Sequence, residues 1–266
     1  DLTREAERRG VELSVWPEAA YPYLLSHEAR RLPLTQARGV TSAGGGPVLF
    51  GFIAFRPEAP AERFNSASLA LPTGELSESY DKMELLWFGE TIPFADTFPA
   101  LRRIFRRSGG LFPGERLVAL TLPRPEGDLR LGVLNCYEDT LPPLGRRIAS
   151  ELDPHLLVNV TNDAWFEGTS EPELHLRLSA MRAVETGRDL VRAVNFGPRA
   201  WIDAYGRIRS VDRSDAAGVL VVEPSPRRGP PSIYTRWGDL SFWILWTLAA
   251  AACRRSGPAP REARAR

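Results

Sequence analysis

The stretch 129–139 joins an apolar, strand-like run to a nucleophilic side chain. It begins Leu-Arg-Leu-Gly-Val-Leu and ends in Asn135, Cys136, Tyr137, Glu138 and Asp139. A thiol at the end of a strand, beside acidic and aromatic groups, is a candidate nucleophile for covalent catalysis. A free cysteine also packs well as a small buried hydrophobe, so this stretch alone leaves both interpretations open.

The basic residues supply a second candidate. Lys and Arg together number 34, and Lys82 is the only lysine among them. Lysine differs from arginine in carrying a compact ammonium whose pKa shifts readily on burial. Lys82 is therefore either a site residue that arginine cannot replace or a single surviving surface lysine.

A thiol nucleophile needs a base to take its proton and a cation to favour negative charge in the site. The three histidines, His27, His155 and His175, form no cluster with Cys136 at a strand end. A Cys–His dyad therefore has little support in this sequence.

Two glutamates are alternative bases. Glu18 follows a predicted strand that Pro17 ends, and it is either a general base or a solvated cap of the next helix. Glu90 lies in an apolar loop and is either a site residue or a loop cap. Together with Lys82 and Cys136, Glu18 completes a trio in which each member comes at the end of a predicted strand.

Strand-like and helix-like segments alternate along the chain, which indicates an α/β fold. In α/β sheets, sites are assembled where strands end, and several polar clusters of this sequence fall there. The turn 72–74 predicts a hairpin, and the glycine-rich stretch 41–47 lacks the Lys-Ser/Thr of a phosphate-binding loop and is expected to be a turn. We expect strands at 11–16, 48–55, 63–71, 76–82, 116–122, 129–135, 155–161, 190–195, 200–204 and 219–223, and helices at 1–10, 23–31, 98–107, 144–151 and 171–188.

Length and composition exclude several classes of protein. The chain has 266 residues and is 43% hydrophobic, enough for a sizeable core. Its formal net charge of +1 gives no global field that would attract nucleic acid. The two cysteines, Cys136 and Cys253, form neither a disulfide framework nor a zinc-binding spacing. We expect no metal.

The C-terminal region differs from the rest. Residues 240–253 are continuously apolar, between Asp239 and the pair Arg254-Arg255. This run is short for a membrane span, which needs about 20 residues, but 233–237 can extend it. We predict a transmembrane helix at 233–253, after a domain at 1–232 and before a tail at 254–266. The arginines of that tail predict a cytoplasmic location for it and the opposite face for the domain. A buried core helix is the alternative.

Four tripeptides and their order resemble the carbon–nitrogen hydrolase (nitrilase) superfamily. They are Trp16-Pro17-Glu18, then Tyr80-Asp81-Lys82 followed by Phe88-Gly89-Glu90, and then Cys136-Tyr137-Glu138. Further matches are similar to the apolipoprotein N-acyltransferase family, and the resemblance runs from about Val11 to Cys253. These matches are 162–166, His175, 182–188, Asn195, Gly197 and 234–239.

The resemblance implies a fold and a mechanism. The fold is a nitrilase-like four-layer α-β-β-α sandwich followed by one C-terminal membrane helix. Glu18 is the implied general base, Cys136 the nucleophile and Lys82 the stabiliser of the oxyanion. Cys136 takes an acyl chain from a phospholipid as a thioester and passes it to the α-amine of a diacylglyceryl-cysteine at a lipoprotein N-terminus. The implied supporting or substrate-binding residues are Glu90, Tyr137, Glu138, Asn162 and Trp165.

The resemblance also implies a setting. The protein works at the bacterial inner membrane, with its catalytic domain on the periplasmic side, and needs no cofactor. The family carries a bundle of membrane helices and a first strand ahead of the segment that begins at Asp1, so the resemblance does not predict activity for this chain alone. Trp87 and Asn135 depart from the residues usual at their positions.

Two other functions remain open at this point. A soluble nitrilase-type amidase acting on a small C–N substrate would share the trio but would not need the apolar segment 240–253. A membrane-tethered domain that binds lipopeptide without catalysis would need the segment but not an intact trio.

Overall fold

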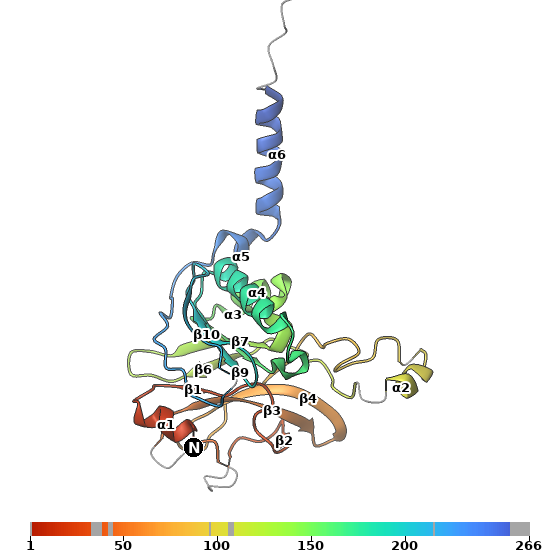
Figure 1. The fold of residues 1–266 in the computed structure, drawn as a ribbon, viewed down its shortest axis with the longest axis vertical. Coiled ribbons are helices and arrows are strands. Elements are labelled where there is room, and N and C mark those ends of the chain that lie inside the picture. The colour runs from red at the N-terminus through yellow and green to blue at the C-terminus, as the bar shows by residue number, and fades with distance from the viewer. Residues whose placement is uncertain are drawn as a thin grey trace, which may run out of the picture.

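Two β-sheets form the centre of the protein in the computed structural model, which describes residues 2–32, 39–41, 45–95, 97–105, 109–214 and 216–255 (Figure 1). The first sheet has the order β1-β3-β4-β5, with β2 also paired to β3. The second has the order β11-β10-β9-β8-β7-β6. The strands are β1 (Ser14–Val15), β2 (Leu25–Ser26), β3 (Val48–Arg56), β4 (Ala59–Ala70), β5 (Tyr80–Asp81), β6 (Ala119–Leu122), β7 (Leu129–Asn135), β8 (Leu156–Thr161), β9 (Leu190–Val194), β10 (Arg199–Ile202) and β11 (Ile208–Asp212).

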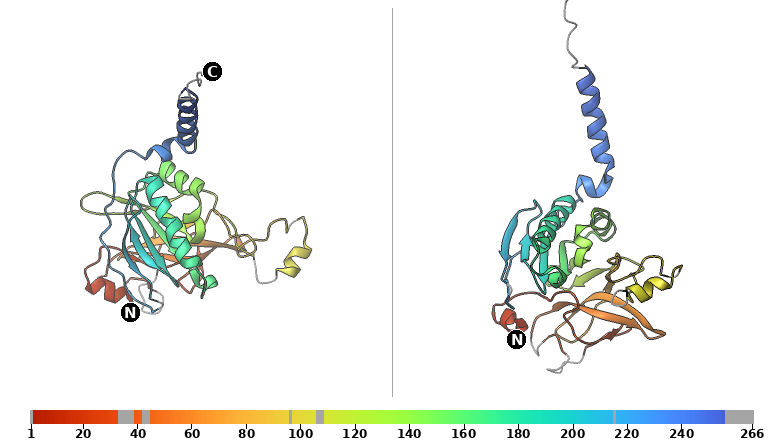
Figure 2. Two further views of the ribbon diagram at one scale, coloured as in Figure 1. Left: turned by 45° about the horizontal axis from the view of Figure 1, so that its top comes forward. Right: turned by 45° about the vertical axis from the view of Figure 1, so that its right-hand side comes forward.

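Helices lie on the outer face of the second sheet. Helices α3 (Pro142–Leu152) and α4 (Glu171–Thr186) cover this face, as Figures 1 and 2 show. These layers confirm the predicted α/β fold. The other helices are α1 (Leu2–Arg8), α2 (Ala100–Ile104), α5 (Ile233–Trp237) and α6 (Leu240–Arg255), with 3-10 turns η1 (Cys136–Thr140) and η2 (Asp163–Phe166).

Apolar residues that alternate along the strands fill the space between the layers. Along β7, Leu131 and Val133 belong to the core shared with Leu49 of the first sheet, whereas Leu134 packs with Ile148 of α3. Because successive side chains of a strand point to opposite faces, one apolar run supplies both cores. Strand β7 is therefore buried on both sides. This burial fixes the position of Asn135 at its C-terminal end and of Cys136, which follows it.

The outer face of the first sheet is not covered by the helix that was expected at 23–31. Phe50 and Phe52 pack there against Tyr21, with Leu25 at the edge of the cluster. The predicted helix at 23–31 is wrong: Leu25 and Ser26 pair with β3 as the short strand β2. Pairing to an open sheet edge thus outweighs the helical pattern of this stretch. Among the described residues, β2 and loops take the place of the fourth layer.

Most other predicted elements are confirmed, and the exceptions are short or exposed. The strand predicted at 219–223 is wrong, and the unpredicted strand β11 (Ile208–Asp212) pairs with β10 instead. Strand β11 has little apolar character and lies at the edge of its sheet, which explains why the pattern missed it. Parts of four expectations, namely residue 1, 42–44, 106–107 and 256–266, lie outside the described residues.

The C-terminal segment leaves the sandwich as two helices. Helix α5 ends at Trp237, Gly238 has a φ of +54°, and α6 begins at Leu240, so the predicted single helix over 233–253 is divided. Helix α6 extends away from the two sheets (Figures 1 and 2). Among the described residues, no helix combines the length and the apolar character needed to cross a membrane, and the predicted span is not confirmed.

Candidate active site

The ends of several strands bring the candidate residues to one edge of the sandwich. Strands β7, β8 and β9 are parallel, so their C-terminal ends meet at the same edge of the second sheet. Cys136 follows β7 directly as the first residue of η1. Lys82 follows β5 of the first sheet, and Glu18 follows β1. The sequence positions 18, 82 and 136 are distant, and the facing of the two sheets brings them together.

Lys82 is the centre of this constellation. Its side chain is 1% exposed, and its Nζ atom donates to Glu90 at 2.8 Å and lies 3.6 Å from Glu18 Oε1. The same Nζ lies 5.3 Å from the centroid of the Tyr137 ring, the residue after the candidate nucleophile. Two neighbouring carboxylates favour the charged form of a buried ammonium. The structure thus brings together Glu18, Lys82, Glu90 and the start of η1.

Burial and neighbouring charges set the protonation of this group. Burial raises the pKa of Cys136 to about 12, with Glu18 adding to the effect and Lys82 opposing it. Burial also raises the pKa of Glu18, against the pull of Lys82, Asn65 and Cys136. Burial alone would lower the pKa of Lys82, but Cys136, Glu18 and Glu90 together raise it above its usual range. The resting site therefore holds a neutral thiol and an ammonium, and the thiol needs a base when it attacks.

The backbone at Cys136 has an unusual conformation. Its φ is +57°, in the left-handed region that residues other than glycine seldom adopt. Asn159 Nδ2 donates to the Cys136 carbonyl oxygen at 2.9 Å and so holds the residue from β8. Strained backbone of this kind persists only where the surroundings enforce it, and it occurs often at functional sites.

Glu138 joins the two segments that carry Lys82 and Cys136. Its carboxylate is fully buried and accepts from Met83 N at 2.7 Å, Glu84 N at 3.0 Å and Asn135 N at 2.7 Å. The Tyr80 hydroxyl donates to it at 2.7 Å. Burial raises the pKa of Glu138 to about 7, although these hydrogen bonds favour the charged form. Glu138 is thus a structural tie across the site.

The other predicted supporting residues lie less centrally. The Tyr137 ring is partly buried beside Lys82, and burial raises the pKa of its hydroxyl to about 12. Asn162 accepts from Ala164 N at 3.2 Å and caps η2. The Trp165 side chain is 76% exposed. Asn162 and Trp165 therefore lie at the correct edge of the sheet, in a surface turn rather than among the residues around Lys82.

A buried cluster of charges lies behind the nucleophile turn. His175 Nε2 lies 2.6 Å from Asp139 Oδ1, and its Nδ1 lies 2.9 Å from Asp163 Oδ1. Arg192 contacts both acids, at 3.0 and 2.5 Å. Burial would lower the pKa of His175, but Asp139 and Asp163 outweigh it and raise this pKa to about 9. A charged imidazolium therefore ties η1 to η2 and α4 at neutral pH.

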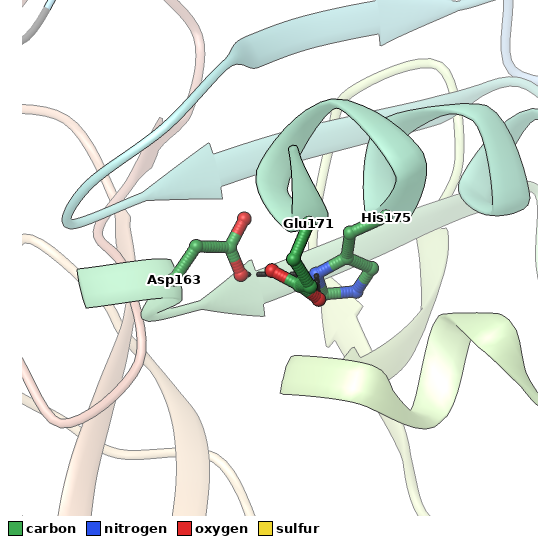
Figure 3. Close-up of side chains that lie close together, drawn as sticks. All are labelled: Asp163, Glu171 and His175. Atoms are coloured by element: carbon green, nitrogen blue, oxygen red, sulfur yellow. Dashed lines mark hydrogen bonds and ion pairs between the residues drawn. The ribbon is translucent and has the colours of Figure 1, made fainter. Parts of the chain in front are cut away.

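Asp163, Glu171 and His175 point toward one another (Figure 3). The oxygen and nitrogen atoms with which they could bind a metal ion all lie within 4.8 Å of one another. This spacing is compatible with a metal ion, but the charges argue otherwise. Arg192 Nη2 lies 2.5 Å from Asp163 Oδ2 and 2.9 Å from His175 Nδ1. The Arg192 guanidinium thus already contacts two of the three candidate ligands, and its positive charge would oppose a divalent cation bound there. The cluster is an ion-pair network.

The sequence pattern missed three residues that shape the site and gave no role to a fourth, Asn195. Asn65 on β4 donates to both Glu18 and Glu90, and Asn159 holds Cys136. Asn195 had appeared only within the resemblance, and its Nδ2 donates to the Glu18 carbonyl oxygen at 2.8 Å. A Cβ atom at Gly51 would lie 2.6 Å from the Pro17 carbonyl oxygen, so only glycine lets the Glu18 segment pack on β3. The roles of these residues depend on which strands pair, and the order of residues along the sequence does not show that pairing.

The chain belongs to the carbon–nitrogen hydrolase family, whose sequence profile matches residues 1–225. Its two-sheet sandwich is similar to the crystal structure of an amidase from Nesterenkonia sp., with a TM-score of 0.56 and 22% identity, over 92% of this chain and 87% of the amidase. At this identity the likeness shows the shared fold.

Within this family, the chain is similar in sequence to curated proteins of one name. The chain is 34% identical over 260 residues to the apolipoprotein N-acyltransferase of Geobacter metallireducens, which covers 96% of this chain and 48% of that protein. It is 32% identical over 261 residues to the protein of the same name from Bradyrhizobium diazoefficiens, over 96% of this chain and 47% of that protein. The chain thus spans about half the length of the curated relatives it matches.

Proposed function

We propose that this chain is the catalytic part of an N-acyltransferase that moves a phospholipid acyl chain to the N-terminal amine of a diacylglyceryl lipoprotein. The names of relatives that are 29–34% identical over most of the chain support this activity. One structural observation carries the chemistry: the buried Lys82 ammonium lies between Glu18 and Glu90 at the edge where η1 presents Cys136.

The first half of the proposed reaction forms a thioester. Glu18 takes the proton of the Cys136 thiol as Sγ attacks the carbonyl carbon of the phospholipid ester. The oxyanion that forms accepts a hydrogen bond from Lys82 Nζ, a stabilisation that acts mainly in the transition state. When the intermediate collapses, the ester C–O bond breaks and Glu18 returns its proton to the leaving alkoxide. The lysophospholipid departs, and the acyl group stays on Cys136.

The second half transfers the acyl group to nitrogen. The α-amine of the acceptor attacks the thioester carbon, and Glu18 takes a proton from that amine. Lys82 stabilises the second oxyanion in the same way. Collapse breaks the C–S bond, Glu18 protonates the departing sulfur, and Cys136 is restored. A thioester divides one difficult transfer into two easier steps.

Exposed apolar residues suggest how lipid reaches this site. In the loop that carries Glu90, Trp87 is 68% exposed and Phe88 is 47% exposed. On α6, Trp243 and Leu245 are 56% and 68% exposed. Large apolar side chains gathered at a surface mark contact with a partner or a lipid phase. We propose that α6 and this loop contact the inner membrane of a bacterium, with the domain on its periplasmic face.

Intact-mass spectrometry tests this function directly. The full-length protein in detergent, incubated with phospholipid of known acyl chains, is compared with Cys136→Ser. We expect a hydroxylamine-sensitive mass increase equal to one acyl group on the wild type alone. A wild type that gains no acyl mass but hydrolyses small amides would instead identify a nitrilase-type amidase. A wild type that binds lipopeptide without either reaction would identify a binding domain.

A further inference from the structure

Asn65 occupies the space between the two carboxylates of the site. It lies on β4, is 3% exposed, and its Nδ2 donates to Glu18 Oε1 at 2.6 Å and to Glu90 Oε1 at 3.1 Å. An amide nitrogen has two hydrogens, so both bonds form at once. Asn65 is therefore the neutral group that holds these two acids at a fixed separation beside Lys82.

Asn135 stabilises the direction of the Asn65 amide that the two carboxylates require. Asn135 is fully buried, directly precedes Cys136, and its Nδ2 donates to Asn65 Oδ1 at 3.0 Å. Reversing the Asn65 amide would place its oxygen against two carboxylate oxygens and its nitrogen against another amide nitrogen. Only one orientation satisfies all three contacts.

We infer that Asn135 and Asn65 form an amide relay that couples the nucleophile turn to the general base, so that Glu18 is held ionised and oriented only while the turn is in place. This relay rests on the proposed role of Glu18. Asn65 and Asn135 are positioning residues within it, because Asn65 acts through Glu18 and Glu90, and Asn135 acts through Asn65.

The relay has a consequence that packing alone would not have. The titratable groups that face Glu18 are Lys82, Glu90 and Cys136, and burial raises the Glu18 pKa while Asn65 and Lys82 lower it. A hydrogen bond to an ionised acid favours its charged form. Without the Asn65 donor, Glu18 would hold its proton to higher pH and would be a base over a narrower range.

The test measures the reactivity of Cys136 rather than turnover. Iodoacetamide alkylation of Cys136 is followed by mass spectrometry as a function of pH in the full-length protein. For Asn65→Ser we expect the acidic limb of the rate profile to move upward by about one to two pH units, as expected for the loss of one hydrogen bond to a charged group. Asn135→Leu removes the amide that donates to Asn65 and leaves Asn65 itself in place, and we expect a smaller shift in the same direction.

Ser68→Ala is the matched control. Ser68 is on the same strand and fully buried, and its hydroxyl donates to the Ser77 carbonyl oxygen at 3.0 Å, away from the site. This variant should keep the wild-type profile. Asn135→Leu also guards against misfolding of Asn65→Ser, since it leaves the contacts of Asn65 to both acids possible.

Two failures are distinguishable. If Glu18→Gln leaves the alkylation profile unchanged, Glu18 is not the base and the proposed mechanism fails. If Glu18→Gln flattens the acidic limb while Asn65→Ser and Asn135→Leu keep it at the wild-type position, the relay is overturned and the mechanism stands.

Discussion

The Lys82 ammonium and the Glu90 carboxylate lie 2.8 Å apart, in a site where the lysine is almost wholly buried. Glu90 Oε2 also accepts from Leu86 N at 2.9 Å, so the loop that follows Lys82 folds back and holds its own cation. This ion pair fixes the direction of the ammonium. A fixed cation needs little reorganisation when negative charge develops beside it, which is the requirement for stabilising an oxyanion.

Lys82→Arg should slow acyl transfer severely even though it keeps the charge. A guanidinium is planar and bulkier than an ammonium, and the 1% exposed site leaves no room for it in the same position. We expect the rate constant for acylation of Cys136 to fall by about 10²–10³-fold, the usual effect of losing one oxyanion donor. Single-turnover acylation of Cys136 measures this rate. A Lys82→Arg protein with near-normal acylation would remove Lys82 from the mechanism.

Glu18→Gln should leave the fold intact and slow acylation by about 10²–10⁴-fold, the range of general base catalysis. Since burial raises the pKa of Glu18, the wild-type rate should fall as the pH drops through that raised value, because the base becomes protonated. Glu84→Gln is the control, since Glu84 is exposed in the adjoining loop. Equal acylation rates in both variants would count against Glu18 as the base.

The sequence predicted Glu18, Lys82 and Cys136 because each of these reactive side chains comes within a few residues of the end of a predicted strand. Cys136 and Lys82 each follow a strand directly, and periodicity located both strands. The sequence could not predict Asn65, because it lies in the middle of β4, and only the pairing of β1 and β4 with β3 in the first sheet brings it beside Glu18. The helix expected at 23–31 failed for a similar reason, since the open edge of β3 was not visible in the local pattern.

The stability of the protein should fall in alkaline solution through His175. Its folded pKa of about 9 lies above the ordinary value of 6.5, so its stabilisation is complete below about pH 6.5 and is lost as the pH rises through about 9. His175 faces Asp139, Asp163, Glu171 and Arg192. The contribution at low pH is on the order of 3 kcal/mol.

Urea unfolding of wild type and His175→Gln at pH 6 and pH 9.5 measures this effect. We expect the glutamine variant to be much less stable than wild type at pH 6 and closer to it at pH 9.5. A difference between the two proteins that does not change with pH would show that His175 is not charged in the folded state.

Gly51→Ala should damage the site without touching any of its polar groups. The new Cβ would lie 2.6 Å from the Pro17 carbonyl oxygen and 2.8 Å from Glu18 Cα, so the backbone that carries the base must move. Overpacking of this kind typically costs about 1–3 kcal/mol of stability. We expect Tm to fall and Cys136 acylation to slow by more than the loss of folded protein explains. Gly46→Ala is the control, because its Cβ would lie 3.6 Å from the Val11 carbonyl oxygen, an ordinary contact. If Gly51→Ala acylates at the wild-type rate per folded molecule, the position of Glu18 does not limit the reaction.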